Sequence, residues 1–160
     1  MTSPEAIPGQ APAIPATGRR VLVSSVSSDS HTWNLVYLQL LLEELGHQVH
    51  NIGACVPDDL VITECRRLLP DLVVVSSVNG HGAIDGRRLI GRLRAEPDLA
   101  ALPVIIGGKL GIKGAVAGTY GPELVAAGFT AVFEDGSGVG DFCRYVGSVK
   151  SPAELTTGGR

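Results

Sequence analysis

An aspartate and a histidine two positions apart are the side chains of this chain best suited to chemistry. Asp29 and His31 stand in the segment DSHTWN, directly after the apolar run 21–26. A carboxylate beside an imidazole can accept a hydrogen bond from one ring nitrogen, which fixes the tautomer and makes the other nitrogen a better metal ligand. The same spacing is also typical of a loop histidine that hydrogen-bonds to nearby backbone, so the rest of the chain must decide between the two interpretations.

A metal site built entirely by the protein would need further ligands. The other histidines, His47, His50 and His81, are not spaced to supply them. His47 and His50 flank a short predicted strand, and we expect both at the surface. A metal that arrives inside a cofactor therefore fits His31 better than a metal held by protein ligands alone.

Two further segments change character where an apolar run ends. Ser76 and Ser77 end one such run, and their hydroxyls could point at a ligand or cap a turn. Gly107 and Gly108 end another. Because glycine has no Cβ atom, this pair lets a bulky group approach the backbone, although any tight turn could use it. Taken alone, neither signal is specific.

The elements that must position these residues alternate between β-branched apolar runs and segments of helical period, which is typical of βα units on a parallel sheet. The predicted strands and helices are, in chain order, 20–26, 34–45, 48–52, 57–69, 71–77, 84–95, 102–106, 120–128, 129–133 and 138–149. We predict an α/β fold, a doubly wound five-stranded parallel sheet in the flavodoxin-like order 2-1-3-4-5 within three αβα layers. In that order the loops 27–34, 77–82 and 107–114 meet at the crevice outside the carboxyl ends of strands one and three.

Two details of the helices are also predicted. Asn34 is placed at the N-cap of the first helix, whose leucines form an apolar stripe. The third helix carries four arginines that we expect on a mostly solvent-exposed face: Arg87, Arg88, Arg92 and Arg94.

Composition limits both the size of the fold and its partners. A chain of 160 residues with 44% hydrophobic but only 4% aromatic side chains fits one domain with an aliphatic core. A net charge of −3 without a Lys/Arg cluster argues against nucleic acid or an anionic membrane as partner, and no apolar run reaches the roughly 20 residues of a membrane span. We expect one domain over residues 20–150, a disordered Pro/Ala-rich tail over 1–19 and a flexible tail over 151–160.

The cysteines indicate the redox environment. Cys55, Cys65 and Cys143 are odd in number and lack metal-type spacing. They are interpreted as free thiols that behave as small buried hydrophobes. Since neither a disulfide framework nor a signal-peptide pattern is present, the expected location is the reducing cytoplasm.

The three polar and glycine segments form a recognisable set. Asp29-Ser30-His31, Ser76-Ser77-Val78 and Gly107-Gly108 resemble, in order and spacing, the signature Asp-x-His-x-x-Gly, Ser-x-Leu, Gly-Gly of cobalamin-binding domains that bind the cofactor base-off and histidine-on. The spacing is similar to that of the separately encoded small subunits of glutamate mutase (methylaspartate mutase), and the likeness covers roughly residues 20–147. Two positions depart from it, because Asn34 stands where the family has glycine and Val78 where it has leucine.

The resemblance implies a role for each part of the signature. His31 would replace the cofactor's own base as the lower axial ligand of cobalt, with Asp29 hydrogen-bonded behind it. Ser76 would hydrogen-bond the displaced nucleotide tail, and Trp33 would pack over the corrin edge or onto a partner protein. The metal ligand is thus His31, and the implied cofactor-binding residues are Ser28, Asp29, Ser30, His31, Thr32, Trp33, Asn34, Ser76, Ser77, Val78, Gly80, Gly107, Gly108, Lys109, Leu110, Gly111, Ile112, Phe133, Glu134, Gly136 and Ser137.

The same resemblance implies a cobalamin-binding subunit of an adenosylcobalamin-dependent carbon-skeleton mutase, which interconverts L-glutamate and threo-3-methylaspartate by a radical rearrangement. The chain has no candidate general base or carboxylate clamp of its own, so we predict no catalytic residue in it and no activity without a larger barrel-shaped catalytic subunit, in a hetero-oligomer.

Two alternatives remain. One is a stand-alone corrinoid carrier or a cobalamin-responsive regulatory module without mutase activity. Methyltransferase modules of this kind usually carry a helical cap before the sheet, for which residues 1–19 are too short, and this favours the mutase. The other is a flavodoxin-like domain that has lost its cofactor and acts only in assembly.

Overall fold

One parallel sheet forms the centre of the molecule. The computed structural model describes residues 18–111, 120–134 and 138–150. Within them the strands β1 (Arg20–Ser25), β2 (Gln48–Asn51), β3 (Leu72–Ser77), β4 (Val104–Gly108) and β5 (Ala131–Glu134) pair in parallel, in the order β2-β1-β3-β4-β5. The predicted fold class and strand order are confirmed. Of the predicted tails over 1–19 and 151–160, residues 1–17 and 151–160 lie outside the described residues.

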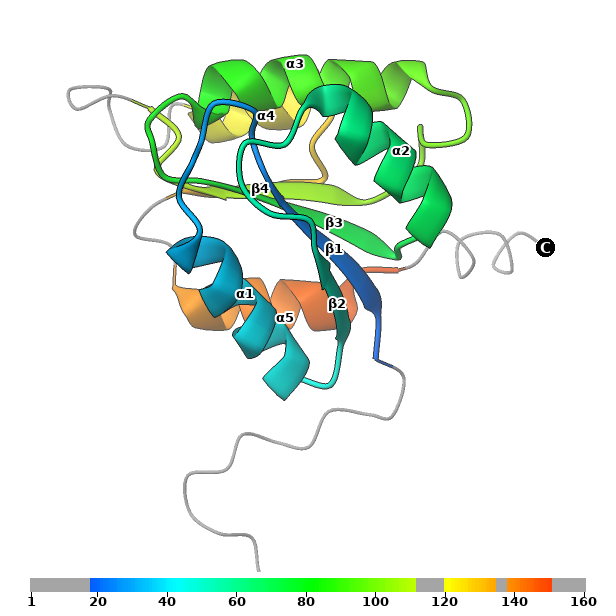
Figure 1. The fold of residues 1–160 in the computed structure, drawn as a ribbon, viewed down its shortest axis with the longest axis vertical. Coiled ribbons are helices and arrows are strands. Elements are labelled where there is room, and N and C mark those ends of the chain that lie inside the picture. The colour runs from blue at the N-terminus through cyan, green and yellow to red at the C-terminus, as the bar shows by residue number, and fades with distance from the viewer. Residues whose placement is uncertain (1–17, 112–119, 135–137, 151–160) are drawn as a thin grey trace, which may run out of the picture.

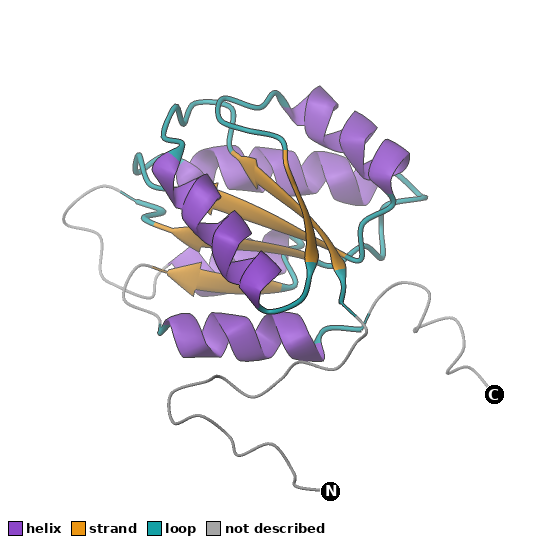
Figure 2. Cartoon of the chain, turned by 60° about the horizontal axis from the view of Figure 1, so that its bottom comes forward, coloured by secondary structure: helices purple, strands orange, loops and turns teal. Residues whose placement is uncertain are grey.

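Helices cover both faces of the sheet, as Figure 1 shows. Helices α1 (Trp33–Glu44) and α5 (Val139–Ser148) lie on one face. Helices α2 (Asp58–Leu68), α3 (Gly82–Ala95) and α4 (Tyr120–Ala127) lie on the other. Figure 2 shows the strands side by side between these two layers. No helix of the described residues is long and apolar enough to cross a membrane.

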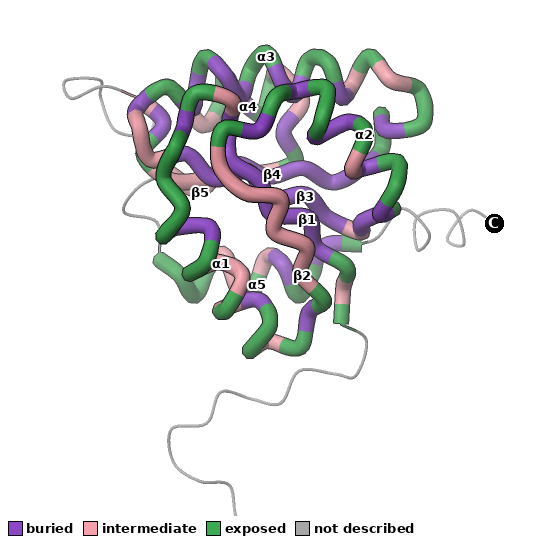
Figure 3. The backbone as a smooth tube through the Cα atoms, viewed as in Figure 1, coloured by how far each residue is buried: buried purple, intermediate pink, exposed green. Residues whose placement is uncertain are grey.

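The three central strands are largely buried because both faces of the sheet are covered. Successive strand residues point to opposite faces, so β3 sends Val73 and Val75 into the core beneath α2, α3 and α4, and Val74 into the core beneath α1 and α5. Every residue of β3 is buried, whereas the edge strand β2 is mostly of intermediate burial, as Figure 3 shows. This explains why the central strands are continuous apolar runs rather than alternating patterns.

The glycine pair belongs to β4 and not to the loop after it. Gly107 and Gly108 pair with Ser76 and Ser77 of β3, so β4 lies two residues further along the chain than the predicted strand 102–106. A Cβ atom on Gly108 would lie 2.2 Å from the carbonyl oxygen of Ser77, and the φ angle of Gly108 is +107°. Glycine is therefore required at position 108 first by the chain itself, whatever else approaches it.

The predicted cap of α1 is wrong by two residues. Thr32 occupies the N-cap position, and Asn34 lies inside the first turn, where it is buried. The amide of Asn34 donates from Nδ2 to Ser76 Oγ at 2.7 Å, instead of capping its own helix. In the folded chain, the amide of Asn34 therefore bonds to a strand of the sheet and not to the first turn of its own helix.

The predicted surface position of His47 is also wrong. Its side chain is buried, and its Nδ1 accepts a hydrogen bond from the backbone N–H of Arg19 at 3.0 Å. Burial, assisted by the positive charge of Arg19, lowers the pKa of His47 below its ordinary value. The protonated form is disfavoured in the folded chain, so His47 is held neutral as part of the β1–β2 edge.

We expect this burial to make stability depend on pH. The unfolded chain takes up a proton on this histidine near about pH 6.5, whereas the folded chain resists protonation to lower pH. The stabilisation that comes from keeping His47 neutral and buried should therefore be fully present above about pH 6.5 and should be lost as the pH falls below it. In urea unfolding at about pH 7.5 and about pH 5.5, His47→Asn, which keeps an acceptor for Arg19, should lose less stability than the wild type. The matched control His81→Asn changes an exposed histidine, and equal losses in wild type and His47→Asn would refute the assignment.

The arginine face of α3 is only partly exposed. Arg94 is half-buried, and its guanidinium donates to the backbone carbonyls of Gly128 and Leu102, which ties α3 to the segments before β4 and β5. Burial lowers the pKa of Arg94. The remaining three arginines of this helix form ion pairs at the surface, as predicted for a mostly solvated face.

The three cysteines occupy different environments. Cys65 is buried in the core, where burial raises the pKa of its thiol to about 12. Cys143 is partly buried, whereas Cys55 is exposed, contrary to the prediction for it. All three are free thiols.

A candidate ligand-binding cleft

Asp29 joins two loops at the carboxyl ends of β1 and β3. Its carboxylate is fully buried. Oδ2 accepts hydrogen bonds from the backbone N–H groups of Val78 at 2.7 Å and Asn79 at 3.3 Å. Oδ1 accepts from the backbone N–H of His31 at 3.0 Å and lies 2.7 Å from His31 Nδ1. One carboxylate therefore holds the β3–α3 loop, the β1–α1 loop and the imidazole together.

The charge of Asp29 determines which ring nitrogen of His31 carries the proton. Burial by itself raises the pKa of this carboxyl, but the hydrogen bonds from Val78 and from the backbone and ring of His31 outweigh it, and the pKa is lowered. An ionised carboxylate at Nδ1 makes that nitrogen the proton donor and leaves the lone pair on Nε2. The side chain of His31 is 47% exposed, so Nε2 can bind a group from outside the domain.

His31 can supply one ligand to such a group. Among residues 18–111, 120–134 and 138–150, no cluster of three or more His, Cys, Asp or Glu side chains could hold a metal ion. A metal at His31 would therefore need its other ligands from elsewhere, as a metal inside a cofactor has.

A polar network that the sequence did not reveal supports the loop that carries His31. Ser28 donates from Oγ to Asp85 of α3 and accepts from Asn79 Nδ2 at 3.0 Å. Arg88 donates to Asp85 at 2.9 Å and to Ser27 Oγ at 2.7 Å. The bonds of Ser27 and Ser28 join residues more than fifty positions apart in the chain, whereas Arg88 and Asp85 are three apart on α3. Only their polar character in the first turns of a helix could have drawn attention to Asp85 and Arg88.

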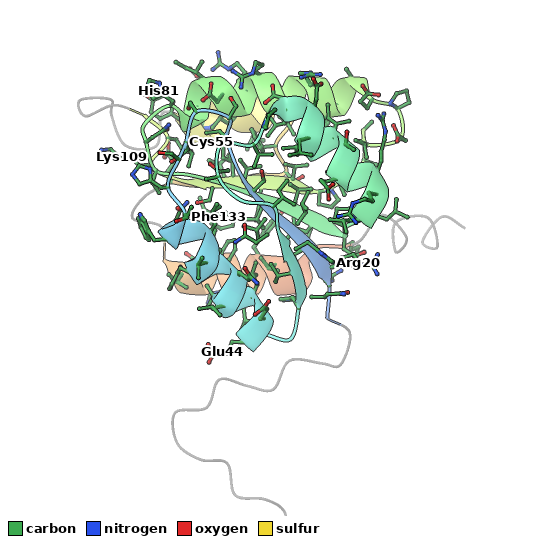
Figure 4. All side chains as sticks on the ribbon, in the orientation of Figure 1. Arg20, Glu44, Cys55, His81, Lys109 and Phe133 are labelled. Atoms are coloured by element: carbon green, nitrogen blue, oxygen red, sulfur yellow. The ribbon has the colours of Figure 1, made fainter. Side chains whose placement is uncertain are left out.

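A cavity of about 260 Å³ begins beside this loop and runs between α1 and α5. Its floor is formed by the ends of β3, β4 and β5, and its walls are mostly apolar side chains, including Tyr37, Leu41 and Phe142. Phe133 lies on this side of the sheet and lines the cavity, and Figure 4 labels it near the start of α1. Trp33 and Asn34, which follow His31 closely in the chain, both line the cavity.

One polar atom in this cavity stands out. Asn34 Nδ2 is bonded to Ser76 Oγ, but Asn34 Oδ1 is buried and has no hydrogen-bond partner among the described residues. Buried polar atoms in native proteins are almost always paired, so an unpaired one calls for an explanation. A ligand in the cavity would provide one.

The structure brings together ten of the twenty-one predicted site residues. Those that build the Asp29–His31 arrangement or line the cavity are Asp29, His31, Trp33, Asn34, Ser76, Val78, Gly107, Gly108, Phe133 and Glu134. Ser30 and Thr32 are exposed on the same loop, and Gly80 forms the turn after β3 with a φ of +87°.

Other predicted residues lie away from the cavity. Ser77 and Leu110 are buried; Leu110 joins the core on the α3 side, and a Cβ atom on Gly82 of α3 would meet both residues within 3 Å. Lys109 is exposed and Gly111 is partly buried, while Ser28 takes part in the network below the loop. Ile112, Gly136 and Ser137 lie outside the described residues.

Known proteins resemble this chain in sequence and in fold. A family model described as the B12 binding domain matches residues 19–136. The glutamate mutase sigma subunit of Halobacterium salinarum is 29% identical over 140 residues, which make up 88% of this chain and 91% of that protein.

Solved structures resemble the chain in fold. A cobalamin-binding protein from Desulfitobacterium hafniense DCB-2 superposes with a TM-score of 0.63 at 20% identity, over 81% of this chain and 60% of that one. The receiver domain of Francisella response regulator 1452 superposes with a TM-score of 0.61 at 16% identity, over 81% of this chain and 93% of that one. Since proteins of different function share this fold, the structural likeness shows the fold alone.

Proposed function

The chain belongs to the B12-binding domain family, and from this membership we propose that it is the cobalamin-binding subunit of an adenosylcobalamin-dependent carbon-skeleton mutase of the glutamate mutase type. The observation that carries the proposal is the Asp29–His31 pair, in which the carboxylate holds Nδ1 and the lone pair of Nε2 is directed away from it. The similarity to the Halobacterium salinarum protein, a glutamate mutase sigma subunit, supports the choice of reaction.

The residues present fit a cobalamin bound base-off. His31 would bind cobalt through Nε2, and Asp29 would keep the ring oriented and its nitrogen basic. The apolar cavity between α1 and α5 would hold the nucleotide tail, with Asn34 and Ser76 as its polar contacts. When bound, the cofactor supplies a cobalt–carbon bond that breaks homolytically, and the protein supplies ligation, orientation and exclusion of water.

A separate subunit would hold the substrate. The described residues that line the cavity include no lysine or arginine that could pair with the two carboxylates of glutamate. The outer face of α1 exposes Trp33, Val36, Tyr37 and Leu40, which recur at helical spacing. Trp33 and Tyr37 also line the cavity, so this apolar surface is continuous with the proposed cofactor site, as a contact with a catalytic large subunit requires.

Reconstitution tests the reaction. We expect the purified chain, mixed with adenosylcobalamin and a glutamate mutase large subunit from the same organism, to convert L-glutamate to threo-3-methylaspartate, measured by chromatography of the products. Neither protein should turn over alone. Cobalamin binding without turnover in the mixture would favour the corrinoid carrier instead, and turnover by this chain alone would contradict the subunit assignment.

A further inference from the structure

Asn34 is a buried amide with only half of its hydrogen-bonding capacity used. Its side chain is 5% exposed, and Nδ2 donates to Ser76 Oγ at 2.7 Å. Oδ1 has no partner in the part of the chain that the structure describes. A buried acceptor without a donor costs free energy that a bound donor would recover. The amide is therefore suited to a ligand group that carries a hydrogen.

Ser76 completes the recognition unit. Its Oγ accepts the hydrogen bond from Asn34, which leaves the hydroxyl hydrogen of Ser76 available to donate. Asn34 lies in the first turn of α1 and Ser76 near the end of β3, and both line the same cavity. Asn34 and Ser76, which both line the cavity, thus bring one unpaired acceptor, Asn34 Oδ1, next to one available donor, Ser76 Oγ–H.

The surroundings of this pair sharpen its selectivity. Many side chains that line the cavity are apolar, among them Leu38, Val74 and Ile105. Such side chains cannot donate a hydrogen bond to Asn34 Oδ1. A site of this kind discriminates strongly against a ligand that lacks the expected N–H group, because its own polar atom is then left unpaired.

Nucleotide bases differ in whether they match this pair. An aminopurine such as adenine presents an amino donor beside a ring-nitrogen acceptor, and this edge is complementary to a neighbouring acceptor and donor. Dimethylbenzimidazole, attached through one ring nitrogen, offers an acceptor for Ser76 but no N–H group for Asn34. The orphaned acceptor is thus satisfied by the first base and not by the second.

We propose that Asn34 and Ser76 make this chain selective for cobamides whose lower base carries an amino group, an aminopurine rather than dimethylbenzimidazole. The proposal rests on the proposed function, because it places the displaced nucleotide tail in the cavity between α1 and α5. It makes Asn34 a specificity-determining residue that acts on the base and not on the cobalt.

Equilibrium binding to the full chain tests the selectivity without any enzymatic assay. Trp33 is the only tryptophan in the chain and lines the cavity, so quenching of its fluorescence by the corrin reports binding. The wild type should bind adeninylcobamide about tenfold more tightly than cobalamin, the factor expected for one buried acceptor that gains or lacks its donor. Asn34→Ala should bring the two affinities to within about twofold of each other. The control Asn51→Ala, which removes an amide bonded to Gln39 away from the cavity, should keep the preference.

The possible results distinguish the proposed selectivity for the lower base from the proposed function on which it rests. Equal binding of both cobamides by the wild type would overturn the selectivity and leave cobalamin binding intact, and this measurement needs no variant. A preference that persists in Asn34→Ala would overturn the role of Asn34. Failure to bind adeninylcobamide, cobalamin and cobinamide, which lacks the nucleotide base, would refute the proposed function itself.

Discussion

Replacing His31 with alanine is expected to abolish coordination of cobalt by a protein nitrogen. The imidazole is the only described side chain that combines an exposed ring nitrogen with a buried carboxylate behind it, and no neighbouring residue of the loop can replace it as a nitrogen ligand. Electron paramagnetic resonance of the Co(II) form, with protein carrying ¹⁵N-histidine, should show nitrogen coupling in the wild type and none in His31→Ala. The folded domain should persist, because the side chain is about half exposed.

A matched histidine serves as the control for this experiment. His81 is exposed and precedes α3 on the neighbouring β3–α3 loop. His81→Ala should therefore retain the full nitrogen coupling of the wild type. Coupling that survives in His31→Ala, or that disappears in His81→Ala, would contradict the assignment of the axial ligand.

Replacing Asp29 with asparagine is expected to damage both stability and ligation. The carboxylate accepts hydrogen bonds from three backbone N–H groups and from the ring of His31, whereas an asparagine has one acceptor oxygen and an amide that faces donors. At least one buried N–H group loses its partner, and the expected loss is about 3 kcal/mol of unfolding free energy. Urea denaturation at neutral pH measures this loss.

Ligation by His31 should weaken in the same variant. Asparagine cannot hold the imidazole with the charge that keeps the lone pair on Nε2, and loss of such a partner typically costs about 10-fold to 100-fold in metal affinity. Titration with cobalamin, followed by Trp33 fluorescence, tests this. Asp59→Asn, which alters an exposed carboxylate paired with Arg92 on the far side of the sheet, should change neither quantity. Wild-type stability in Asp29→Asn would show that the carboxylate does not join the two loops.

Much of the architecture could be predicted because it depends on short stretches of sequence. The apolar run of β3 and the helical period of α1 each occupy one element, and parallel strands joined by helices allow few arrangements. Asp29 and His31 are also close in the chain, so their hydrogen bond follows from local geometry. The prediction of the sheet order is confirmed for the same reason.

The errors came from contacts between distant segments. Asn34 was expected to cap its own helix, but it lies beside Ser76, 42 positions away. His47 was expected at the surface, but it is buried against the backbone of Arg19. In both cases a local preference for capping or exposure was weaker than a hydrogen bond formed across the fold, and nothing in a single sequence states which distant residue will be the partner.

The sequence by itself determined the alternation of strands and helices, the position of an imidazole at a sheet edge, and its carboxylate partner, because periodicity and a two-residue spacing are local properties. Only the tertiary structure decided that Asp29 also holds the loop after β3, that Gly108 packs against the backbone of Ser77, and that Asn34 keeps an unpaired oxygen in the cavity. Those features depend on strand register and on which face each side chain takes, and both are settled only when the whole sheet packs.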